Sequence, residues 1–272
     1  MLRNTALLRS HVESQLQGRI TSPFTQAGPA AFELVSSGIP EIDAFAGGLP
    51  RGALTEIIGA PCSGRMTLLL ASLALRSAEG EACALIDIQD TFDPPTAAAA
   101  GVVLERLLWV RCRNLDQGLR AADLLMQSGG FGMVAMDLGE VAPKTVRHVP
   151  LNVWFRFRRA VEHTPTILLL LTQEPNASCA SLVLRLEAEP ARWSAAASEH
   201  ATDPSFTHLL ESVPIWPLLV RSRLRSAPAI VLNEGSNEGP FSNDPAPAVR
   251  FETKMTWTDF NEREAFAPQA PV

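Results

Sequence analysis

The residues best suited to chemistry lie in one short stretch, GAPCSGRM, at positions 59–66. An apolar run at 53–58 precedes it, and a helical-looking run at 67–75 follows it. A strand, a tight glycine loop and a helix in this order are typical of a phosphate-binding loop, whose backbone N–H groups hold an anion. The consensus is G-x-x-x-x-G-K-[ST], and both glycines are present.

The same loop departs from the consensus at its two chemical positions. Arg65 stands where the lysine is expected, and Met66 stands where a hydroxyl would bind Mg²⁺. Thr67 carries a hydroxyl one residue late. We therefore predict a degenerate phosphate loop with low nucleotide occupancy, made of Gly59, Ser63, Gly64, Arg65, Met66 and Thr67. Alternatively, the glycines serve only a tight strand-to-helix turn.

The segments around this loop alternate between apolar strands and helices, which favours an α/β fold with a mostly parallel central sheet and helices on both faces. Pro40 is expected to open a helical turn that Gly47 and Gly48 close, and Asp116 to cap a helix. The pattern predicts a further helix at 154–161 and strands at 32–35, 53–58, 82–88, 107–112, 133–137, 166–172, 181–186 and 218–224. For residues 190–213 the sequence pattern predicts neither a helix nor a strand clearly.

The chain divides into three parts by composition. Residues 1–30 read as an N-terminal helix and linker, 31–235 as the core, and 236–272 as a flexible C-terminal tail. The first helix has an apolar stripe that must pack on its own domain or on a partner. The tail either folds on a partner or stays flexible. Candidate partner-binding residues in these two parts are Leu7, Leu8, Val12 and Trp257.

Composition limits the function further. The chain has 272 residues and a formal charge of −6, which argues against broad, nonspecific nucleic-acid binding. Its four cysteines and five histidines show no metal-ligand spacing, so no metal is expected. No apolar run is long enough for a membrane span, and the N-terminus lacks a signal-peptide core. We expect a cytoplasmic protein that does not associate with membranes.

The ordered motifs between about 36 and 235 resemble the RecA recombinase family. G-G-L-P-R-G-A-L-T-E-I-I-G resembles its approach to the Walker A loop, and A-L-I-D-I-Q-D its strand and turn with the catalytic carboxylate. M-V-A-M-D-L resembles its Walker B strand and L-L-L-L-T-Q its sensor strand. L-V-R-S-R-L, with Arg221 and Arg223, resembles a basic pair that contacts a neighbouring subunit.

The resemblance implies which catalytic positions survive. Gln89 replaces the glutamate that activates water and cannot act as a general base. Asp137 and Gln173 remain at the Walker B and sensor positions. The family's lysine, its Mg²⁺-binding hydroxyl and its catalytic base are all replaced in this sequence. Gln89, Asp137 and Gln173 are therefore expected to be vestigial, and no residue is expected to be catalytic. The segment after Gln173 is also short for a DNA-binding loop, so weak or no direct DNA binding is expected.

The sequence also resembles ImuA-type proteins, RecA-like accessory factors of error-prone DNA synthesis. This implies a non-catalytic accessory protein of the bacterial DNA-damage (SOS) response that acts in translesion synthesis through protein contacts. The implied partners are RecA, an ImuB-type polymerase-like protein and an error-prone polymerase alpha subunit, with nucleoid association during damage. Two alternatives remain open: a weak or atypical DNA-dependent ATPase, and a nucleotide-binding sensor without hydrolysis.

Overall fold

The computed structural model describes residues 32–193, 210–224 and 250–254. The predicted N-terminal helix with Leu7, Leu8 and Val12 lies outside the described residues, as do Trp257 and most of the predicted tail. Within the described residues, no helix is long and apolar enough to cross a membrane.

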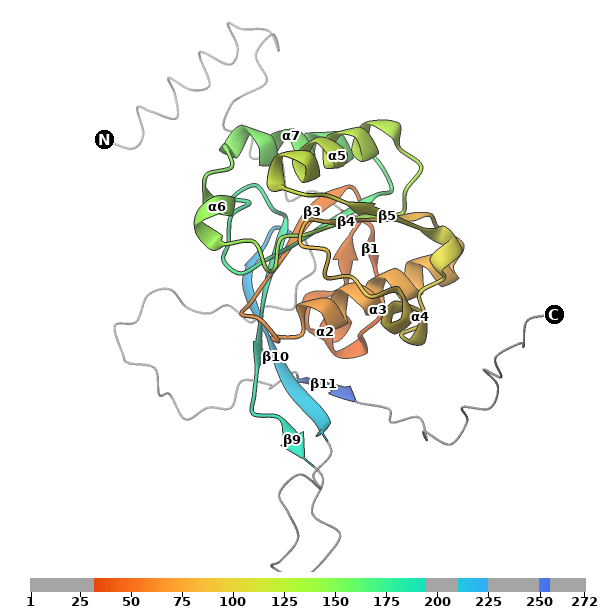
Figure 1. Ribbon diagram of the computed structural model, residues 1–272, viewed down its shortest axis with the longest axis vertical. Coiled ribbons are helices and arrows are strands. Elements are labelled where there is room, and N and C mark those ends of the chain that lie inside the picture. Colours follow the sequence, from red (N-terminus) through yellow and green to blue (C-terminus); the bar gives the residue numbers. More distant parts are fainter. Residues whose placement is uncertain (1–31, 194–209, 225–249, 255–272) are drawn as a thin grey trace, which may run out of the picture.

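A large mixed sheet forms the centre of the molecule (Figure 1), in the order β11-β10-β8-β3-β7-β6-β4-β5, with β9 pairing β10. The six strands from β8 to β5 are parallel, whereas β9 and β11 run antiparallel to β10, which is antiparallel to β8. The strands are β3 (Ala53–Ile58), β4 (Cys83–Asp87), β5 (Leu107–Arg111), β6 (Met133–Asp137), β7 (Ile167–Thr172), β8 (Leu182–Ala188), β9 (Arg192–Trp193), β10 (Leu210–Ser222) and β11 (Phe251–Lys254). A separate small sheet pairs β1 (Leu34–Val35) with β2 (Leu49–Pro50).

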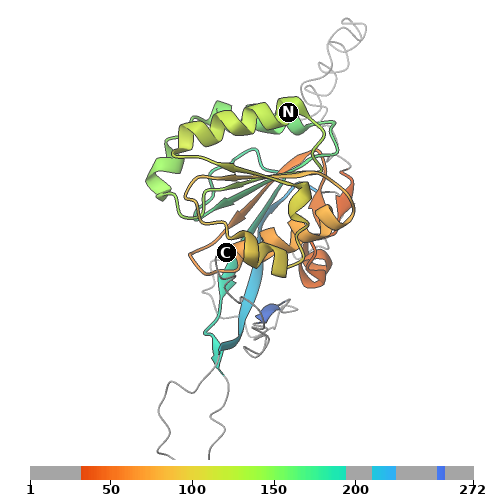
Figure 2. The ribbon, with the colours of Figure 1, turned by 45° about the vertical axis from the view of Figure 1, so that its right-hand side comes forward.

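Helices cover both faces of the large sheet (Figure 2). One face carries α2 (Pro40–Ala46), α3 (Arg65–Ala78) and α4 (Pro94–Ala99); the other carries α5 (Leu115–Ser128), α6 (Pro143–Arg147) and α7 (Leu151–Val161). A short 3₁₀ turn, Leu104–Arg106, precedes β5. Each face of the sheet packs against its helices in a separate hydrophobic core. Residues of β3 contribute to both cores: Ile57 packs on the α3 side, and Leu54 and Ile58 pack on the α7 side. The predicted mostly parallel α/β fold is confirmed.

Several elements differ from the sequence-based expectation, including α4, α6 and β9, which were not predicted. Asn114, not Asp116, caps α5, because its side chain accepts a hydrogen bond from the Gln117 N–H. Strand β10 begins at Leu210 rather than at 218, although Pro214 and Pro217 lie within it. Residues 251–254, expected in a flexible tail, pair with the first half of β10, which buries Phe251 against the core.

Candidate functional site

The phosphate-like loop connects β3 to α3 at the carboxyl edge of the parallel strands. The Gly59 N–H donates to the Thr172 carbonyl at 3.2 Å, which ties the loop to the end of β7. A Cβ on Gly59 would lie 2.3 Å from Ser63 Oγ and 2.6 Å from the Leu186 carbonyl oxygen. Gly64 has φ of +90° and would place a Cβ 2.1 Å from Ile215 Cδ1. Packing therefore requires both glycines, whether or not a ligand binds.

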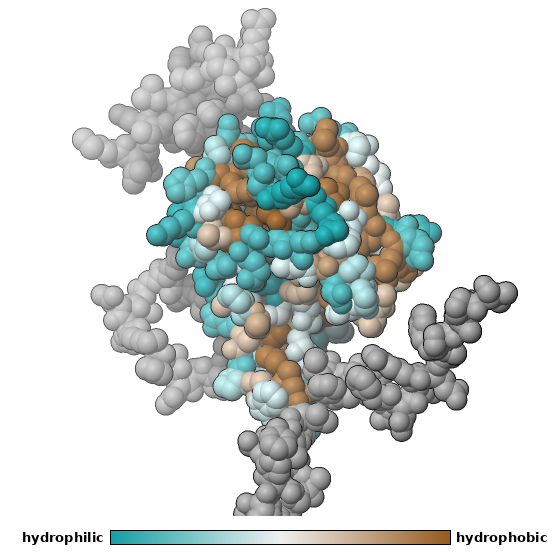
Figure 3. Space-filling view, in the orientation of Figure 1, coloured by the Kyte–Doolittle hydropathy of each residue, from teal (hydrophilic) through white to brown (hydrophobic). Residues whose placement is uncertain are grey.

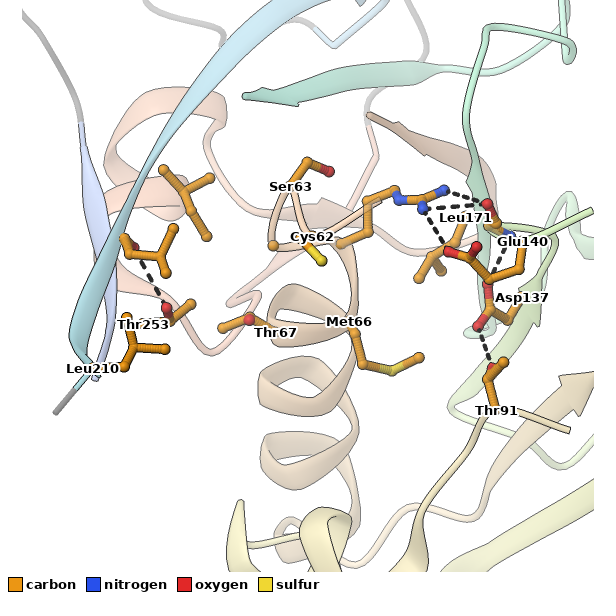
Figure 4. Close-up of a pocket in the computed structure, with 15 residues that line it drawn as sticks. Cys62, Ser63, Met66, Thr67, Thr91, Asp137, Glu140, Leu171, Leu210 and Thr253 are labelled. Carbon is orange, nitrogen blue, oxygen red and sulfur yellow. Dashed lines mark hydrogen bonds and ion pairs between the residues drawn. The ribbon is translucent and has the colours of Figure 1, made fainter. Parts of the chain in front are cut away.

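A pocket of about 560 Å³ opens over this loop (Figure 4). The loop and the start of α3 form its floor, and residues that follow β4 and β6 form one wall. The opposite wall comes from β10 and β11. The lining residues are Cys62, Ser63, Gly64, Arg65, Met66, Thr67, Thr91, Asp137, Gly139, Glu140, Leu171, Leu210, Val213, Ile215 and Thr253.

The side chain of Arg65 is bound to protein on the β6 side of this pocket. Both terminal guanidinium nitrogens donate to the Gly139 carbonyl at 3.2 Å, and Nη2 lies 3.4 Å from Glu140 Oε1. The residue is only 6% exposed. Burial lowers the pKa of Arg65, while the nearby carboxylates of Asp137 and Glu140 oppose that shift. The guanidinium thus cross-links the phosphate-like loop to the loop after β6.

Asp137 ends β6 and faces the same pocket. Its Oδ1 accepts from the Gly139 N–H at 2.8 Å, and its Oδ2 accepts from the Thr91 hydroxyl at 3.4 Å. Burial raises the pKa of the Asp137 carboxyl, against the opposing effects of the Gly139 hydrogen bond and the Arg65 charge. The predicted Walker B position is therefore a buried carboxylate held by the protein's own donors.

Gln173 joins the same network from the end of β7. Its Nε2 donates to the Gly139 carbonyl at 2.8 Å, so this oxygen accepts from both Arg65 and Gln173. A Cβ on Gly139 would lie 2.8 Å from Arg65 Nη1 and 2.9 Å from Asp137 Oδ1, so a side chain would break the arrangement. Sequence analysis missed Gly139, although a glycine two residues after the β6 carboxylate was a usable signal.

Gln89 does not join the other predicted positions. It is exposed, in a bend after β4, and does not line the pocket. The neighbouring buried carboxylate is Asp87, which faces Asp137 across β4 and β6. Asp87 accepts from the backbone N–H groups of Thr91 and Phe92 and from the Trp109 indole. Asp87 is a second residue that sequence analysis missed, and it shapes the loop that brings Thr91 to Asp137.

Arg221 and Arg223, expected at a partner surface, both contact the loop between β7 and β8. Arg221 donates to the Ser178 carbonyl at 2.8 Å, and Arg223 donates to the same oxygen at 3.2 Å. From inside the sheet, the buried carboxylate of Glu56 accepts from the N–H groups of Asn176 and Ala177. Burial raises the pKa of Glu56. This loop is thus anchored from both sides, and sequence analysis missed Glu56, which lies within an otherwise apolar strand.

The pocket differs from the Walker A consensus at two lining positions. A thioether at Met66 offers no hard oxygen ligand for Mg²⁺. The planar fork of Arg65 is committed to a carbonyl and does not substitute for a compact ammonium. Among the residues that the structure describes, no group of three or more His, Cys, Asp or Glu side chains is placed to hold a metal.

The fold and the site together define an α/β domain with a phosphate-type loop. Residues 16–147 match the RecA N-terminal domain family. Protein RecA of Acinetobacter baumannii is 36% identical over 117 residues, which is 42% of this chain and 34% of that protein. The chain thus matches only about a third of the curated relative. The RadB recombinase crystal structure matches with a TM-score of 0.51 at 16% identity, over 71% of this chain and 92% of that one. The chain is therefore similar in sequence to the RecA N-terminal domain over residues 16–147, and its fold is similar to that of the RadB recombinase.

Proposed function

We propose that this protein is a non-catalytic, RecA-like accessory factor that works through protein contacts. The observation that carries the proposal is the Arg65 guanidinium, which hydrogen-bonds to Gly139 on the β6 side of the pocket. Phosphoryl transfer needs cations and a metal on the phosphates and a group that positions the nucleophile. Here Met66 occupies the metal-ligand position, and Gln89 lies outside the pocket.

The biological setting that we propose is damage-induced translesion synthesis, as in ImuA-type proteins. RecA, an ImuB-type polymerase-like protein and an error-prone polymerase alpha subunit are the proposed partners. A RecA-like subunit that binds a filament end without ATP turnover would cap or destabilise that filament. Direct binding of each purified candidate, with Arg223→Ala as a surface variant, tests this part of the proposal.

Phosphate release from ATP by the purified full chain tests the loss of catalysis. We expect no release above background, with or without single-stranded DNA. Asp137→Ala and the exposed control Asp90→Ala should give the same result. DNA-stimulated release that disappears in Asp137→Ala but persists in Asp90→Ala would establish the alternative, a weak ATPase.

One observation favours a second candidate, a nucleotide-binding sensor without hydrolysis. Ser63 is 2% exposed and lines the pocket, yet its Oγ has no hydrogen-bond partner among the described residues. A bound phosphate oxygen would satisfy this hydroxyl. Thermal shift with ATP, with and without Mg²⁺, separates the candidates, because only the sensor is stabilised by nucleotide.

A further inference from the structure

The strand β11 carries the chain directly to the wall of the degenerate pocket. Thr253 lines the pocket, stands opposite Val213 in the sheet and donates its hydroxyl to the Val213 carbonyl at 3.4 Å. The strand ends at the next residue, Lys254, and residues 255–272 follow. The segment after β11 therefore starts beside the pocket that the phosphate-like loop forms.

This wall is apolar, unlike a surface built for a triphosphate. It presents Val213 and Ile215, whereas Met66 extends from the start of α3 toward Thr91 on the other side of the pocket (Figure 4). Apolar residues continue along the projecting part of β10 (Figure 3). The pocket volume falls within the range of sites that enclose small organic groups. Filling it with an aromatic side chain would remove this apolar surface from water.

The chain supplies such a group within reach. The sequence after β11 is M-T-W-T-D-F, so Trp257 follows Thr253 by four residues. Four residues span at most about 13–14 Å when extended. A tethered group also has an effective concentration in the millimolar range, so a weak contact suffices. Indole presents an apolar body and an N–H donor, and the pocket offers the carboxylates of Asp137 and Glu140 as acceptors.

We propose that this pocket is the docking site of the chain's own C-terminal segment, with the Trp257 indole against Val213 and Ile215. The inference rests on the proposed function, because a pocket that held nucleotide would not be free for an indole. The degenerate loop then serves as a receptor for an aromatic peptide. A partner that binds the segment through Trp257 would uncover the pocket, which couples partner binding to this site.

Cys62 provides a native reporter, since it is exposed at the pocket while Cys83 and Cys179 are buried. The rate of Cys62 alkylation by iodoacetamide, followed by peptide mass spectrometry, is compared between the full chain and full-length Trp257→Ala. We expect several-fold faster alkylation in Trp257→Ala. The matched control Phe266→Ala, further along the same segment, should react at the wild-type rate. Half-buried Cys112 reports any general loosening of the fold.

Three outcomes would overturn the proposal. Equal Cys62 rates in the wild type and Trp257→Ala would do so, as would an equal increase in Phe266→Ala. Protection that appears only at high protein concentration would assign the occupant to a second copy. A synthetic peptide of residues 255–272 should restore protection to Trp257→Ala, whereas a scrambled peptide should not. Protection of Cys62 by Mg·ATP in Trp257→Ala would instead favour the second candidate, the nucleotide-binding sensor, over the first, and the comparison of wild type with Trp257→Ala would still decide the docking proposal.

Discussion

At the scale of single residues, Arg65 explains how this loop keeps its shape. The guanidinium fork brings two N–H donors to one carbonyl, which a lysine ammonium cannot do with the same planar geometry. The positive charge also lies near the buried Asp137 and offsets part of the cost of burying that carboxylate. The motif spacing showed that Arg65 occupies the lysine position. It did not predict that the side chain points toward the Gly139 carbonyl, because spacing does not determine the direction of a long side chain.

Replacing Asp137 with asparagine tests this electrostatic description. The pKa of Asp137 is raised by burial above its usual 3.8, so the unfolded chain loses this proton at lower pH than the folded chain. The wild type therefore loses stability as pH rises from about 4 through the folded-state pKa. Asp137→Asn has no carboxyl group to ionise, so it should gain stability relative to the wild type as pH rises through this interval. Thermal melts from acid to neutral pH measure this as an increasing difference in melting temperature, variant minus wild type.

Asp90 provides a control of opposite sign. Its hydrogen bond to Arg111 holds the pKa of Asp90 below the usual value, so the wild-type carboxylate contributes stability that appears as pH rises. Asp90→Asn should thus lose stability relative to the wild type on going from acid to neutral pH. If both variants showed the same slope, burial would not be the origin of the Asp137 shift.

At the scale of elements, β10 supports the phosphate-like loop. Ile215 packs so close to Gly64 that a Cβ there would lie 2.1 Å from Ile215 Cδ1. Continuous apolar runs predicted β3 and β6 to the residue, because strands buried on both faces carry such runs. The first half of β10 escaped prediction because Pro214 and Pro217 argue against a strand, and because its partner β11 lies far along the sequence.

A double-mutant cycle measures the contact between these two elements. Gly64→Ala should destabilise the protein through its left-handed backbone, at about 1–2 kcal/mol, and through the clash with Ile215. Ile215→Ala should cost about 2–5 kcal/mol because it empties a buried site. Urea unfolding of the double variant should show less than the sum, since truncation of Ile215 removes the clash. Strict additivity would contradict the packing described.

At the scale of the whole molecule, the sheet joins parts of the chain that are distant in sequence. The alternation of strands and helices predicted the parallel centre and the helices on both faces. It did not predict β9, β11 or the first half of β10, nor the antiparallel direction of these strands, because β9 and β11 are short and prolines interrupt the first half of β10. Strands β10 and β11 complete the wall of the site, so the site depends on residues beyond the part that matches the RecA N-terminal domain.

Phe251→Ala tests whether this last strand is part of the folded unit. Phe251 is 4% exposed and pairs with Ile215 across β10 and β11, so its truncation removes a large side chain from the core. We expect the free energy of unfolding to fall by about 3–5 kcal/mol in urea titrations. Phe266→Ala replaces the same residue type after β11 and should stay within about 0.5 kcal/mol of the wild type. Equal, small effects of the two substitutions would mean that residues 251–254 contribute little to the stability of the fold. Strand β11, with Thr253, would then not form a stable wall of the pocket.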